Sequence, residues 1–458
     1  MLKPVIFKAN DIRGVTEGDE PEWDEAGAYA LGGAFVEVFG LVGGRVVLGR
    51  DIRLSGPRMS AAFVEAVLDA GTDVIDVGLA STDELWFASG RHDLPGVMFT
   101  ASHNPGEYNG IKFCHPGARP IAPDELVVIA ERASAGPATP AAARGTRSEL
   151  DVLGAYAEHL HALVDLTGIR PLTVVADAGN GMAGHTLPAV FPGGADGPPV
   201  EVIGLYTDPD GNFPNHPANP LVPENLLDAR AAVRERGADL ALVFDGDADR
   251  CFIIDERGEV VSPSTVTALI ASQELARHPG STVVVNKITS RSVAEVVEEH
   301  GGTTVVTKVG HTFVKAAMAE RDAVFGGEHS AHYYFREFWG ADTGMLAALH
   351  VMAVAGRSDQ PLSALVASFA RYAASGEIST TVADQASVID AVAAGFDGRG
   401  EADRVDGLTV SGPDWWLNVR SSNTEPLLRL NVEARTEEQM VSLRDDALAI
   451  IRSSAAQH

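Results

Sequence analysis

The chain has 458 residues, a formal net charge of −28 at pH 7 and 45% hydrophobic residues. A chain of this length is expected to form roughly three or four domains and to bury a sizeable core. Nucleic-acid binding requires a basic surface, and attachment to an anionic membrane requires basic clusters. The acidic balance therefore argues against both kinds of partner.

Further sequence features predict a soluble, cytoplasmic protein. No stretch reaches the roughly 18 uninterrupted apolar residues that span a bilayer, and residues 1–7 lack the apolar core and cleavage site of a signal peptide. Cys114 and Cys251 are the only cysteines, which is too few for a disulfide framework in a chain of this length. We expect both to be small, semi-apolar residues in strands.

β-Branched runs, turn residues and Ala-rich stretches alternate along the chain, which predicts α/β units on mostly parallel or mixed sheets. Turn-forming residues separate the expected strands from the helices that follow them. The expected strands are 46–51, 74–78, 172–177, 240–244, 283–286 and 303–307, and the expected helices are 57–70, 150–166, 290–300 and 437–452.

Changes in composition mark the expected domain boundaries. Residues 133–146 are rich in Ala, Gly and Pro, residues 208–223 contain five prolines, and a third break lies near 375–381. The part from 405 to 451 combines strand patterns with an amphipathic helix, so we expect a smaller α+β domain there. The first three parts have similar lengths and a similar order of elements, but their sequences show no convincing repeat.

The segment 99–113, Phe-Thr-Ala-Ser-His-Asn-Pro-Gly-Glu-Tyr-Asn-Gly-Ile-Lys-Phe, places Ser102 beside His103 at the end of an apolar run, with Lys112 ten residues further on. Asn-Pro-Gly and Asn-Gly are turn-forming sequences. A serine that a tight loop presents beside His and Lys is a candidate covalent carrier. The same residues also suit an ordinary strand followed by a polar loop, so spacing alone leaves both interpretations open.

Three aspartates, Asp245, Asp247 and Asp249, follow the apolar run 240–244 at every second position. This spacing points their carboxylates to one side of an extended chain, where they repel one another unless a cation intervenes. Carboxylate oxygens suit Mg²⁺ or Ca²⁺. An EF-hand is disfavoured because Arg250 occupies the sixth position, where that loop needs Gly. An Asp-rich surface turn stays open as an alternative.

Two further loops carry groups of polar side chains. Residues 326–332, Gly-Gly-Glu-His-Ser-Ala-His, offer a carboxylate, a hydroxyl and imidazoles, which can bind adjacent sugar hydroxyls or form a polar β-turn. Residues 420–426, Arg-Ser-Ser-Asn-Thr-Glu-Pro, offer a guanidinium and several short donors that suit a phosphate dianion. They also suit a turn between two strands.

Taken together, these motifs resemble the α-D-phosphohexomutases, the phosphoglucomutase and phosphomannomutase superfamily. Residues 100–105 are similar to its phosphoserine loop, and segments 245–250, 326–332 and 420–426 match the family in the same order. The resemblance spans most of the chain. It implies an α/β fold of four domains around one central cleft, in which three similar domains with mixed sheets precede a smaller C-terminal α+β domain.

Each implied domain has a role in this resemblance. We expect a phosphoserine domain at 1–148, a metal-binding domain at 149–255, a sugar-recognition domain at 256–370 and a C-terminal phosphate-binding domain at 371–458.

The resemblance also implies the residues of the reactive centre. Ser102 carries the phosphoryl group and binds Mg²⁺ together with the three aspartates of 245–249. Arg250 and Lys112 stabilise the charge on the transferred group. Lys112 or His103 shuttles the proton, and Lys112 is favoured as the base because nearby cations would help to lower its pKa. The implied catalytic residues are Ser102, His103, Lys112, Arg250 and Arg13, and the implied metal ligands are Ser102, Asp245, Asp247 and Asp249.

A second set of residues is implied for substrate recognition. Two positions near these residues depart from the family pattern. Asn10 stands where many members have Tyr, and Ala331 stands where many have Gly. Arg429 is expected to pair within its own domain. The implied sugar contacts are Glu328, Ser330, His311, Lys287, Lys308 and His332, and the implied phosphate contacts are Arg420, Ser422, Asn423 and Thr424.

The residue after Glu328 varies with the substrate in this family. His329, in Glu-His-Ser-Ala-His, is closer to phosphomannomutases than to the Glu-Gln-Ser of phosphoglucosamine mutases. The resemblance therefore implies interconversion of mannose 6-phosphate and mannose 1-phosphate through a phosphoserine and a hexose 1,6-bisphosphate. Mg²⁺ is the expected cofactor, and the bisphosphate is the expected activator. A phosphoglucomutase or a dual-specificity enzyme is the alternative, and a phosphoglucosamine mutase is less favoured.

Two other classes of protein stay open. One is a Mg²⁺-dependent sugar phosphatase with Asp245 as its nucleophile, which stable phosphate on serine would exclude. The other is a non-catalytic phosphosugar-binding protein. In every case we expect a phosphosugar as the ligand and a monomer or weak homodimer.

Overall fold

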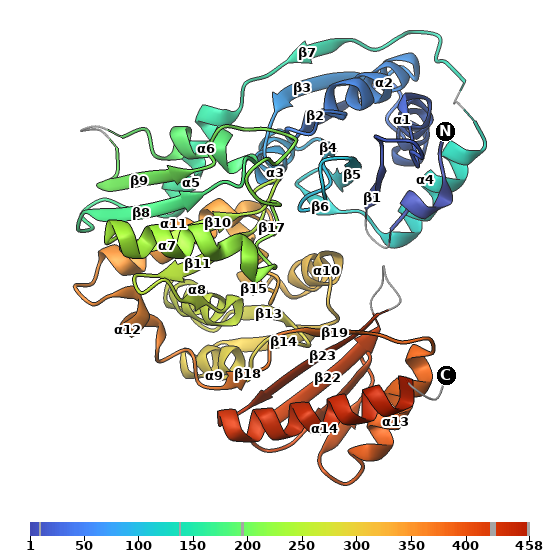
Figure 1. Cartoon of the computed structure of the whole chain (residues 1–458). Helices are drawn as coiled ribbons and strands as arrows, with labels where there is room; N and C mark the ends of the chain where they lie inside the picture. The colour runs from blue at the N-terminus through green and yellow to red at the C-terminus, as the bar shows by residue number, and fades with distance from the viewer. Residues whose placement is uncertain (9–10, 137–138, 194–196, 422–426, 456–458) are drawn as a thin grey trace.

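The computed structural model describes residues 1–8, 11–136, 139–193, 197–421 and 427–455. Four sheets of seven, five, five and six strands follow one another along the chain, from the blue N-terminal part to the red C-terminal part of Figure 1. We call the parts built on them domains 1 (12–149), 2 (153–261), 3 (263–366) and 4 (373–455). The expected α/β architecture of four domains is confirmed.

Domain 1 has strand order β1-β5-β4-β2-β3-β7, with β6 paired to β5. It follows a short 3₁₀ helix, η1 (Pro4–Ile6). Its elements are β1 (Ile12–Val15), α1 (Glu25–Phe39), β2 (Arg45–Arg50), α2 (Gly56–Asp69), β3 (Asp73–Leu79), α3 (Thr82–His92), β4 (Gly96–Phe99), β5 (Tyr108–His115), β6 (Arg119–Pro120), α4 (Pro123–Ser134) and β7 (Arg147–Glu149).

Domain 2 has strand order β12-β11-β10-β8-β9. Its central strand β10 is buried along its whole length, as expected for a continuous apolar run between covered faces. The elements are α5 (Leu153–Leu163), β8 (Leu172–Asp177), α6 (Ala183–Val190), β9 (Val200–Leu205), η2 (Pro223–Leu226), α7 (Leu227–Arg236), β10 (Leu240–Phe244), β11 (Cys251–Asp255) and β12 (Val260–Val261).

Domain 3 has strand order β14-β13-β15-β16-β17. Its elements are α8 (Pro263–Arg277), β13 (Thr282–Asn286), α9 (Arg291–Glu299), β14 (Thr303–Thr307), α10 (His311–Arg321), β15 (Phe325–Gly327), β16 (Tyr333–Phe335), η3 (Arg336–Phe338), β17 (Ala341–Asp342), α11 (Gly344–Gly356) and α12 (Leu362–Val366).

Domain 4 has strand order β18-β23-β22-β21-β20, with β19 paired to β23, and all its pairs are antiparallel. This is the smaller α+β domain that the sequence predicts. Its elements are β18 (Ala373–Ala374), β19 (Ile378–Thr381), α13 (Gln385–Gly395), β20 (Glu401–Asp403), β21 (Leu408–Ser411), β22 (Trp415–Ser421), β23 (Leu427–Ala434) and α14 (Glu437–Ala455).

Domains 1, 2 and 3 share a topology, as the resemblance implies, although their sequences show no convincing repeat. The common strand order is β3-β2-β4-β5, β9-β8-β10-β11 and β14-β13-β15-β16. In each domain the first three strands are parallel, and the fourth returns antiparallel to the third. The loop between the third and fourth strands is therefore equivalent in all three. We call these loops the serine loop (100–107), the aspartate loop (245–250) and the glutamate loop (328–332).

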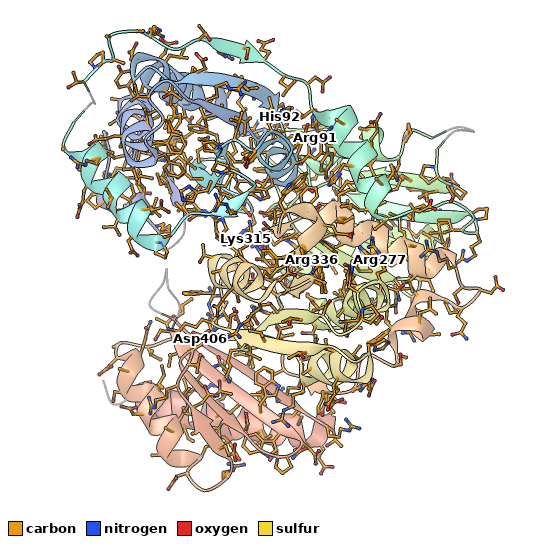
Figure 2. The ribbon with its side chains drawn as sticks, turned by 180° about the vertical axis from the view of Figure 1, so that it is seen from behind. Arg91, His92, Arg277, Lys315, Arg336 and Asp406 are labelled. Carbon is orange, nitrogen blue, oxygen red and sulfur yellow. The ribbon has the colours of Figure 1, made fainter. Side chains whose placement is uncertain are left out.

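The hydrophobic core divides the molecule unevenly. One cluster of buried apolar side chains runs through domains 1, 2 and 3, domain 1 has a second cluster, and the cluster of domain 4 is separate from both. Domains 3 and 4 meet through polar contacts, such as Arg291 Nη1 to Pro413 O at 2.6 Å and Val309 N to Asp406 Oδ2 at 2.9 Å. Figure 2 shows Asp406 at this boundary. Domains 1 to 3 thus form one packed body.

The start of helix α3 joins the first three domains. Ser81 and Glu84 form a capping box there, which satisfies the free N–H groups of the first turn. The buried carboxylate of Asp83 accepts hydrogen bonds from Tyr156 Oη of domain 2 and Thr343 Oγ1 of domain 3, both at 2.7 Å. Burial raises the pKa of Asp83 to about 6. This junction sets the relative position of the three loops.

Two smaller expectations are also met. Cys114 and Cys251 are buried in β5 and β11, so both are core residues of strands. Within the described part of the chain, every helix is too short or too polar to cross a bilayer.

Candidate active site

The serine loop presents Ser102 in a strained conformation. Its φ of +50° lies in the left-handed region, which costs roughly 1–2 kcal/mol for a residue with a side chain. The hydroxyl of Thr100 accepts a hydrogen bond from the backbone N–H of Ser102 at 2.9 Å and supports this turn. Such strain persists only where the surroundings impose it, so the loop is built to aim the serine side chain.

The hydroxyl of Ser102 is the meeting point of the serine and aspartate loops. Its Oγ lies 2.8 Å from Asp245 Oδ2, 3.1 Å from Arg250 Nη2 and 3.2 Å from His103 Nδ1. Arg250 also contacts His103 and binds Asp245 through Nε at 2.7 Å. The side chain is only 4% exposed. Residues that are 143 or more positions apart in sequence therefore surround one hydroxyl.

The close approach of these two loops depends on a glycine. A Cβ at Gly246 would lie 2.5 Å from the carbonyl oxygen of Ser102, closer than any real side-chain carbon comes. The glycine lets the aspartate loop pass directly against the serine loop.

The three aspartates project together, as the sequence predicts. Ligand oxygens of Asp245, Asp247 and Asp249 all lie within 4.8 Å of one another. Asp247 Oδ2 accepts from Thr82 Oγ1 at 2.6 Å and from Lys112 Nζ at 2.8 Å, and Asp249 Oδ2 accepts from Lys112 at 2.6 Å. The Oδ1 atoms of Asp247 and Asp249 are buried without a hydrogen-bond partner. Two buried carboxylate oxygens without a hydrogen-bond partner fit a hard divalent cation.

The charges in this cluster shift one another strongly. Burial raises the pKa of Asp245 to about 7, although Arg250 opposes the shift. Burial alone would also raise the pKa of Asp247, but Lys112 holds it below its ordinary value. A cation bound among the three carboxylates would lower the pKa of Asp245 and relieve their mutual repulsion.

One sequence-based expectation about Lys112 is wrong. Nearby cations were expected to lower its pKa, but its neighbours are the carboxylates of Asp247 and Asp249. Although burial alone would lower it, these carboxylates raise the pKa of Lys112 well above its ordinary value. By contrast, burial and Arg250 keep the pKa of His103 well below its ordinary value, so its ring is neutral.

Arg13 and Arg53 both donate hydrogen bonds to the serine loop. Arg13, on β1, donates to Asn104 Oδ1 at 2.8 Å, so it lies beside the serine loop as predicted. Arg53, in the turn after β2, is fully buried and donates to several backbone carbonyls of the loop, among them Ser102 O at 2.8 Å. Sequence analysis did not single out Arg53. The available signal was an Asp-x-Arg pair of charges directly after an apolar strand.

The glutamate loop fixes its carboxylate firmly. Glu328 is 2% exposed and accepts from Tyr334 Oη at 2.7 Å and Asn286 Nδ2 at 3.0 Å. Ala331 adopts φ +64° in the same loop and is fully buried. A left-handed conformation there explains why glycine suits this position, and the structure accommodates alanine instead. Ser330 is half-buried at the tip of the loop.

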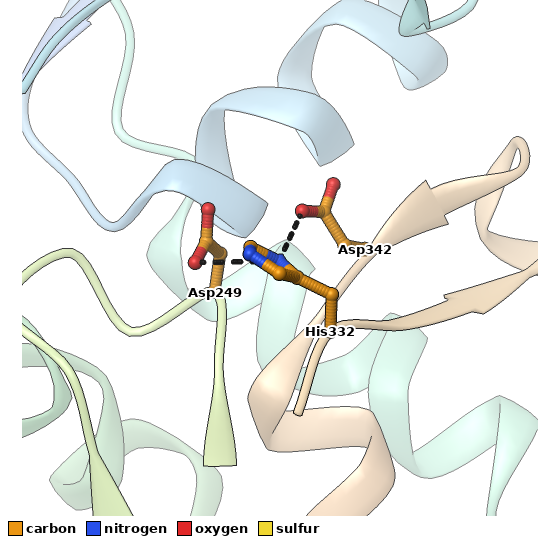
Figure 3. A group of neighbouring side chains, drawn as sticks. All are labelled: Asp249, His332 and Asp342. Atoms are coloured by element: carbon orange, nitrogen blue, oxygen red, sulfur yellow. Dashed lines mark hydrogen bonds and ion pairs between the residues drawn. The ribbon is translucent and has the colours of Figure 1, made fainter. Parts of the chain in front are cut away.

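A chain of charged groups connects the glutamate and aspartate loops (Figure 3). His332 Nδ1 lies 3.0 Å from Asp342 Oδ2 and 3.8 Å from Asp249 Oδ1. Lys315 binds Asp342 Oδ1 at 2.6 Å and lies 4.8 Å from the ring centre of Trp86 in domain 1, at the place labelled in Figure 2. Sequence analysis predicted His332 but missed Lys315 and Asp342. Nothing in their local sequence distinguishes them from core or surface residues.

The remaining predicted recognition residues are more open. Lys287 Nζ pairs with Asp403 Oδ2 at 2.6 Å across the boundary of domains 3 and 4, and Lys308 is exposed. His311, at the start of α10, has a pKa lowered to about 4 by burial, and its ring centre lies 6.5 Å from that of His332.

In domain 4, two arginines bind the same carboxylate. Arg420 Nη2 and Arg429 Nη1 donate to Glu377 at 2.7 and 2.9 Å, so Arg429 pairs within its own domain as predicted. His329 Nε2 lies 3.8 Å from the same carboxylate. The predicted residues Ser422, Asn423 and Thr424, like Asn10, lie outside the described residues.

The geometry defines a class of protein. A buried serine hydroxyl beside an arginine and a loop of three aspartates, on three topologically equivalent α/β domains, is an arrangement that suits an enzyme of phosphoryl transfer.

Comparison with known proteins identifies the family. Models described as phosphoglucomutase/phosphomannomutase α/β/α domains I, II and III match residues 4–138, 154–258 and 262–372, and the C-terminal domain model matches 377–450. The chain belongs to the phosphoglucomutase/phosphomannomutase family, and it is an isomerase of the phosphohexomutase class.

Individual relatives are similar to this chain over almost its whole length. The phosphomannomutase of Salmonella typhimurium strain LT2 is 41% identical, with 98% of this chain and 99% of its own covered. Proteins named phosphohexose mutases from Xanthomonas campestris are 40% identical over 97% of this chain and 98% of their own. The crystal structure of a phosphoglucomutase/phosphomannomutase family protein from Burkholderia thailandensis has a TM-score of 0.87 at 33% identity, covering 99% and 98% of the two chains.

Proposed function

We propose that this enzyme is a Mg²⁺-dependent phosphomannomutase that interconverts mannose 6-phosphate and mannose 1-phosphate. The observation that carries the proposal is the position of Ser102 Oγ, 2.8 Å from Asp245 Oδ2 and 3.1 Å from Arg250 Nη2. One hydroxyl lies between a loop suited to a cation and a guanidinium suited to phosphoryl charge. The phosphomannomutases at 41% and 39% identity support mannose as the sugar.

In the proposed reaction, Ser102 begins as phosphoserine. Its Oγ–P bond breaks while an O–P bond forms to the free hydroxyl of the bound sugar phosphate, which gives a hexose 1,6-bisphosphate. The proton of that hydroxyl passes to Ser102 Oγ. After the sugar reorients, the other phosphoryl group returns to Ser102 by the reverse step. Loss of the bisphosphate would leave the serine unphosphorylated, so added hexose 1,6-bisphosphate acts as an activator.

We assign the proton transfer to His103. Its Nδ1 lies 3.2 Å from Ser102 Oγ and also contacts Arg250 Nη2, so the neutral ring can accept and return a proton once it gives up the contact with Arg250. Lys112 keeps its proton because of its two ion pairs. We assign to Lys112 and Arg250 the stabilisation of charge on the transferred group.

The three aspartates would hold Mg²⁺ together with an oxygen carried by Ser102. When bound, the cation supplies electrostatic stabilisation of the negative charge on the phosphoryl group. The Oδ1 atoms of Asp247 and Asp249, which are buried without a hydrogen-bond partner, support this assignment. A shell that the protein completes only in part leaves room for phosphate oxygens and water, as Mg²⁺ prefers.

Recognition is assigned to domains 3 and 4. Glu328 and Ser330 would bind sugar hydroxyls, and Lys287, Lys308, His311 and His332 would contact the phosphosugar. Arg420 with Ser422, Asn423 and Thr424 would bind the phosphate that does not react. Arg420 and Lys287 pair with carboxylates in this structure, so the incoming phosphate exchanges with those partners.

Substrate kinetics test the function directly. We expect the highest kcat/KM for mannose 1-phosphate among mannose, glucose and glucosamine 1-phosphates, measured with Mg²⁺ and hexose 1,6-bisphosphate. Equal mannose and glucose values would instead establish dual specificity, which the relatives named phosphohexose mutases favour as the second candidate. A preference for glucosamine would refute the assignment based on His329.

A second measurement separates the mutase from a phosphatase. We expect phosphate that is stable on Ser102 after denaturation, observed by intact-protein and peptide mass spectrometry. Phosphate found on Asp245 instead would indicate a hydrolase of a different mechanism.

A further inference from the structure

The most completely bonded side chain near the centre is Arg53, which has no assigned role. It lies between β2 and α2, and its side chain is 0% exposed. A guanidinium has five N–H donors, and the structure uses all of them. Nε donates to Asp51 Oδ2 at 3.1 Å, Nη1 donates to Pro105 O at 2.6 Å and Tyr108 O at 2.9 Å, and Nη2 donates to Ser102 O and Asn104 O at 2.8 Å each.

These bonds make the guanidinium a template for the serine loop. Four backbone carbonyls between residues 102 and 108 turn inward onto one planar group. One of them belongs to Ser102, whose backbone is strained at φ +50°. Four converging carbonyls repel one another unless a multiple donor lies between them. Lysine has fewer donors and no planar fork, so it cannot replace arginine here.

Domain 2 also packs against the guanidinium of Arg53. The ring of Phe213 lies 5.5 Å from the guanidinium carbon of Arg53, within the range of a cation–π contact. A Cβ at Gly211 would lie 2.6 Å from Ile52 O, and a Cβ at Gly106 would lie 2.6 Å from Gly211 O. The proline-rich segment 208–223 therefore packs against both Arg53's turn and the serine loop, and it excludes water from the guanidinium.

We propose that Arg53 is a positioning residue for phosphoryl transfer, which fixes the backbone of the serine loop so that Ser102 Oγ faces Asp245 and Arg250. Phe213 holds the guanidinium in its plane and links the loop to domain 2. This inference rests on the proposed role of Ser102 as phosphoryl carrier. It deepens that role, because the geometry of the carrier depends on a residue that never touches the substrate.

The proposal predicts a particular kinetic signature. A displacement of a reacting group by about 1 Å can lower a rate about 10²-fold. Arg53 supports the reacting serine but not the sugar site of domains 3 and 4. Loss of the template should therefore lower kcat and the single-turnover rate of transfer to and from Ser102, while KM for the sugar phosphate stays unchanged. A purely structural role would lower the folded fraction and leave kcat per folded molecule intact.

The experiment begins with the carrier itself. Intact mass after incubation with hexose 1,6-bisphosphate should show one phosphate on the wild type and none on Ser102→Ala. If Ser102→Ala is still phosphorylated, the proposed carrier is wrong, and the role of Arg53 falls with it. If the wild type behaves as expected, the Arg53 variants test the positioning role alone.

Arg53→Lys is the main variant, and Arg58→Lys is its matched control. Arg58 lies on the adjoining helix α2 and pairs with Glu17 and Glu25, both at 2.7 Å, so the control makes the same exchange away from the serine loop. We expect kcat per folded Arg53→Lys molecule to fall about 10²-fold with KM within twofold, and Arg58→Lys to match the wild type. Wild-type kcat in folded Arg53→Lys would overturn the proposal.

Phe213→Leu keeps the proposal testable if Arg53→Lys does not fold. Phe213 is half-buried, so leucine should preserve the packing and remove only the ring above the guanidinium. We expect kcat to fall about two- to fivefold, which matches the energy of a cation–π contact, again with KM unchanged. Unchanged kcat in Phe213→Leu, with Arg53→Lys unfolded, would overturn the proposal.

Discussion

The proposed reactive and recognition halves of the site are built differently. In domains 1 and 2, Ser102, Asp245 and Asp247 are buried and contact one another or shared partners directly across the domain boundary. In domains 3 and 4, the cations Lys287 and Arg420 pair with nearby carboxylates. The first half joins domains that share one hydrophobic cluster, whereas the second half lies between domains 3 and 4, whose clusters are separate.

This difference matches what each half must do. Phosphoryl transfer depends on positioning and preorganised charge, so its groups are held in a rigid, buried network. Recognition must accept the sugar in two orientations, so its cations should change partners easily. The Lys287–Asp403 pair is partly exposed, at 21% and 39%, and exposed ion pairs contribute little to stability. A phosphate is therefore expected to displace Asp403 from Lys287 at low cost.

The largest effect on turnover is expected at Ser102, in the reactive half of the site. Ser102→Ala removes the phosphoryl acceptor without changing the fold, since alanine can keep the same backbone. We expect turnover to fall by roughly 10³-fold or more and the binding of mannose 1-phosphate to stay within a few fold. Stopped-flow kinetics and calorimetry measure the two quantities. A variant that loses binding as well would contradict the separation of the two halves.

A smaller effect is expected from Thr82, which supports a metal ligand without reaching the substrate. Thr82→Val removes the 2.6 Å hydrogen bond to Asp247 Oδ2. Outer partners of metal ligands typically contribute about 10- to 100-fold to metal affinity or activity, so the Mg²⁺ concentration for half-maximal rate should rise by that factor. Thr72→Val, which removes a hydrogen bond of 2.7 Å to Leu41 O in domain 1, is the control and should leave the Mg²⁺ dependence unchanged.

In the recognition half, Glu328→Gln should weaken the binding of both mannose 1-phosphate and mannose 6-phosphate. Glutamine keeps the size of the side chain and removes its charge. Hydrogen bonds to charged groups contribute about 1.5–3 kcal/mol, which corresponds to a loss of affinity of at least tenfold. Calorimetric titration of each isomer checks the result. If both affinities are intact, the assignment of the sugar site to the glutamate loop is wrong.

The smallest effect on turnover is expected from Glu84→Gln, at the junction of domains 1 and 2. Glu84 is 2% exposed; Asp83 and Asp151 face it, and His185 lies 3.6 Å away. Burial raises the pKa of Glu84 from 4.5 to about 8. The folded state therefore binds this proton more tightly than the unfolded state, so wild-type stability falls as the pH rises from 4.5 through 8.

Glutamine cannot ionise, so the stability of Glu84→Gln should not fall in this way as the pH rises. The free energy of unfolding of the variant, relative to that of the wild type, should increase by on the order of 1 kcal/mol per pH unit between pH 6 and 8. Its kcat should be unchanged. Thermal melting at several pH values checks this, with Asp403→Asn at the boundary of domains 3 and 4 as the control. Parallel pH profiles for wild type and Glu84→Gln would contradict the buried character of the junction.

Contiguous motifs made much of the site predictable. Asp245, Asp247 and Asp249 alternate after one apolar strand, and the extended backbone alone places their side chains together. The segments around Ser102 and Glu328 likewise carry their chemistry within a few residues. These residues do lie together, while their catalytic roles, the domain limits, the oligomeric state and the cytoplasmic location stay predictions.

Long-range partners were not predictable in the same way. Arg53 reaches carbonyls about 50 residues away, and Thr82 reaches Asp247 across 165 positions. A buried polar group is recognised by what it contacts, and the sequence does not record those contacts. The pKa of Lys112 was misjudged for the same reason, because its sign depends on which charges folding places around the ammonium group.

The sequence by itself determined the α/β character and the motif-bearing loops, because periodicity, turn residues and short motifs are local properties of a chain. The family resemblance of those motifs implied the order of four domains. Only the tertiary structure decided that three of those loops are equivalent turns of one repeated topology, and that a single buried arginine shapes the loop of Ser102. Strand order and burial are set by hydrogen bonds and packing between distant segments, and many different side chains satisfy them equally well.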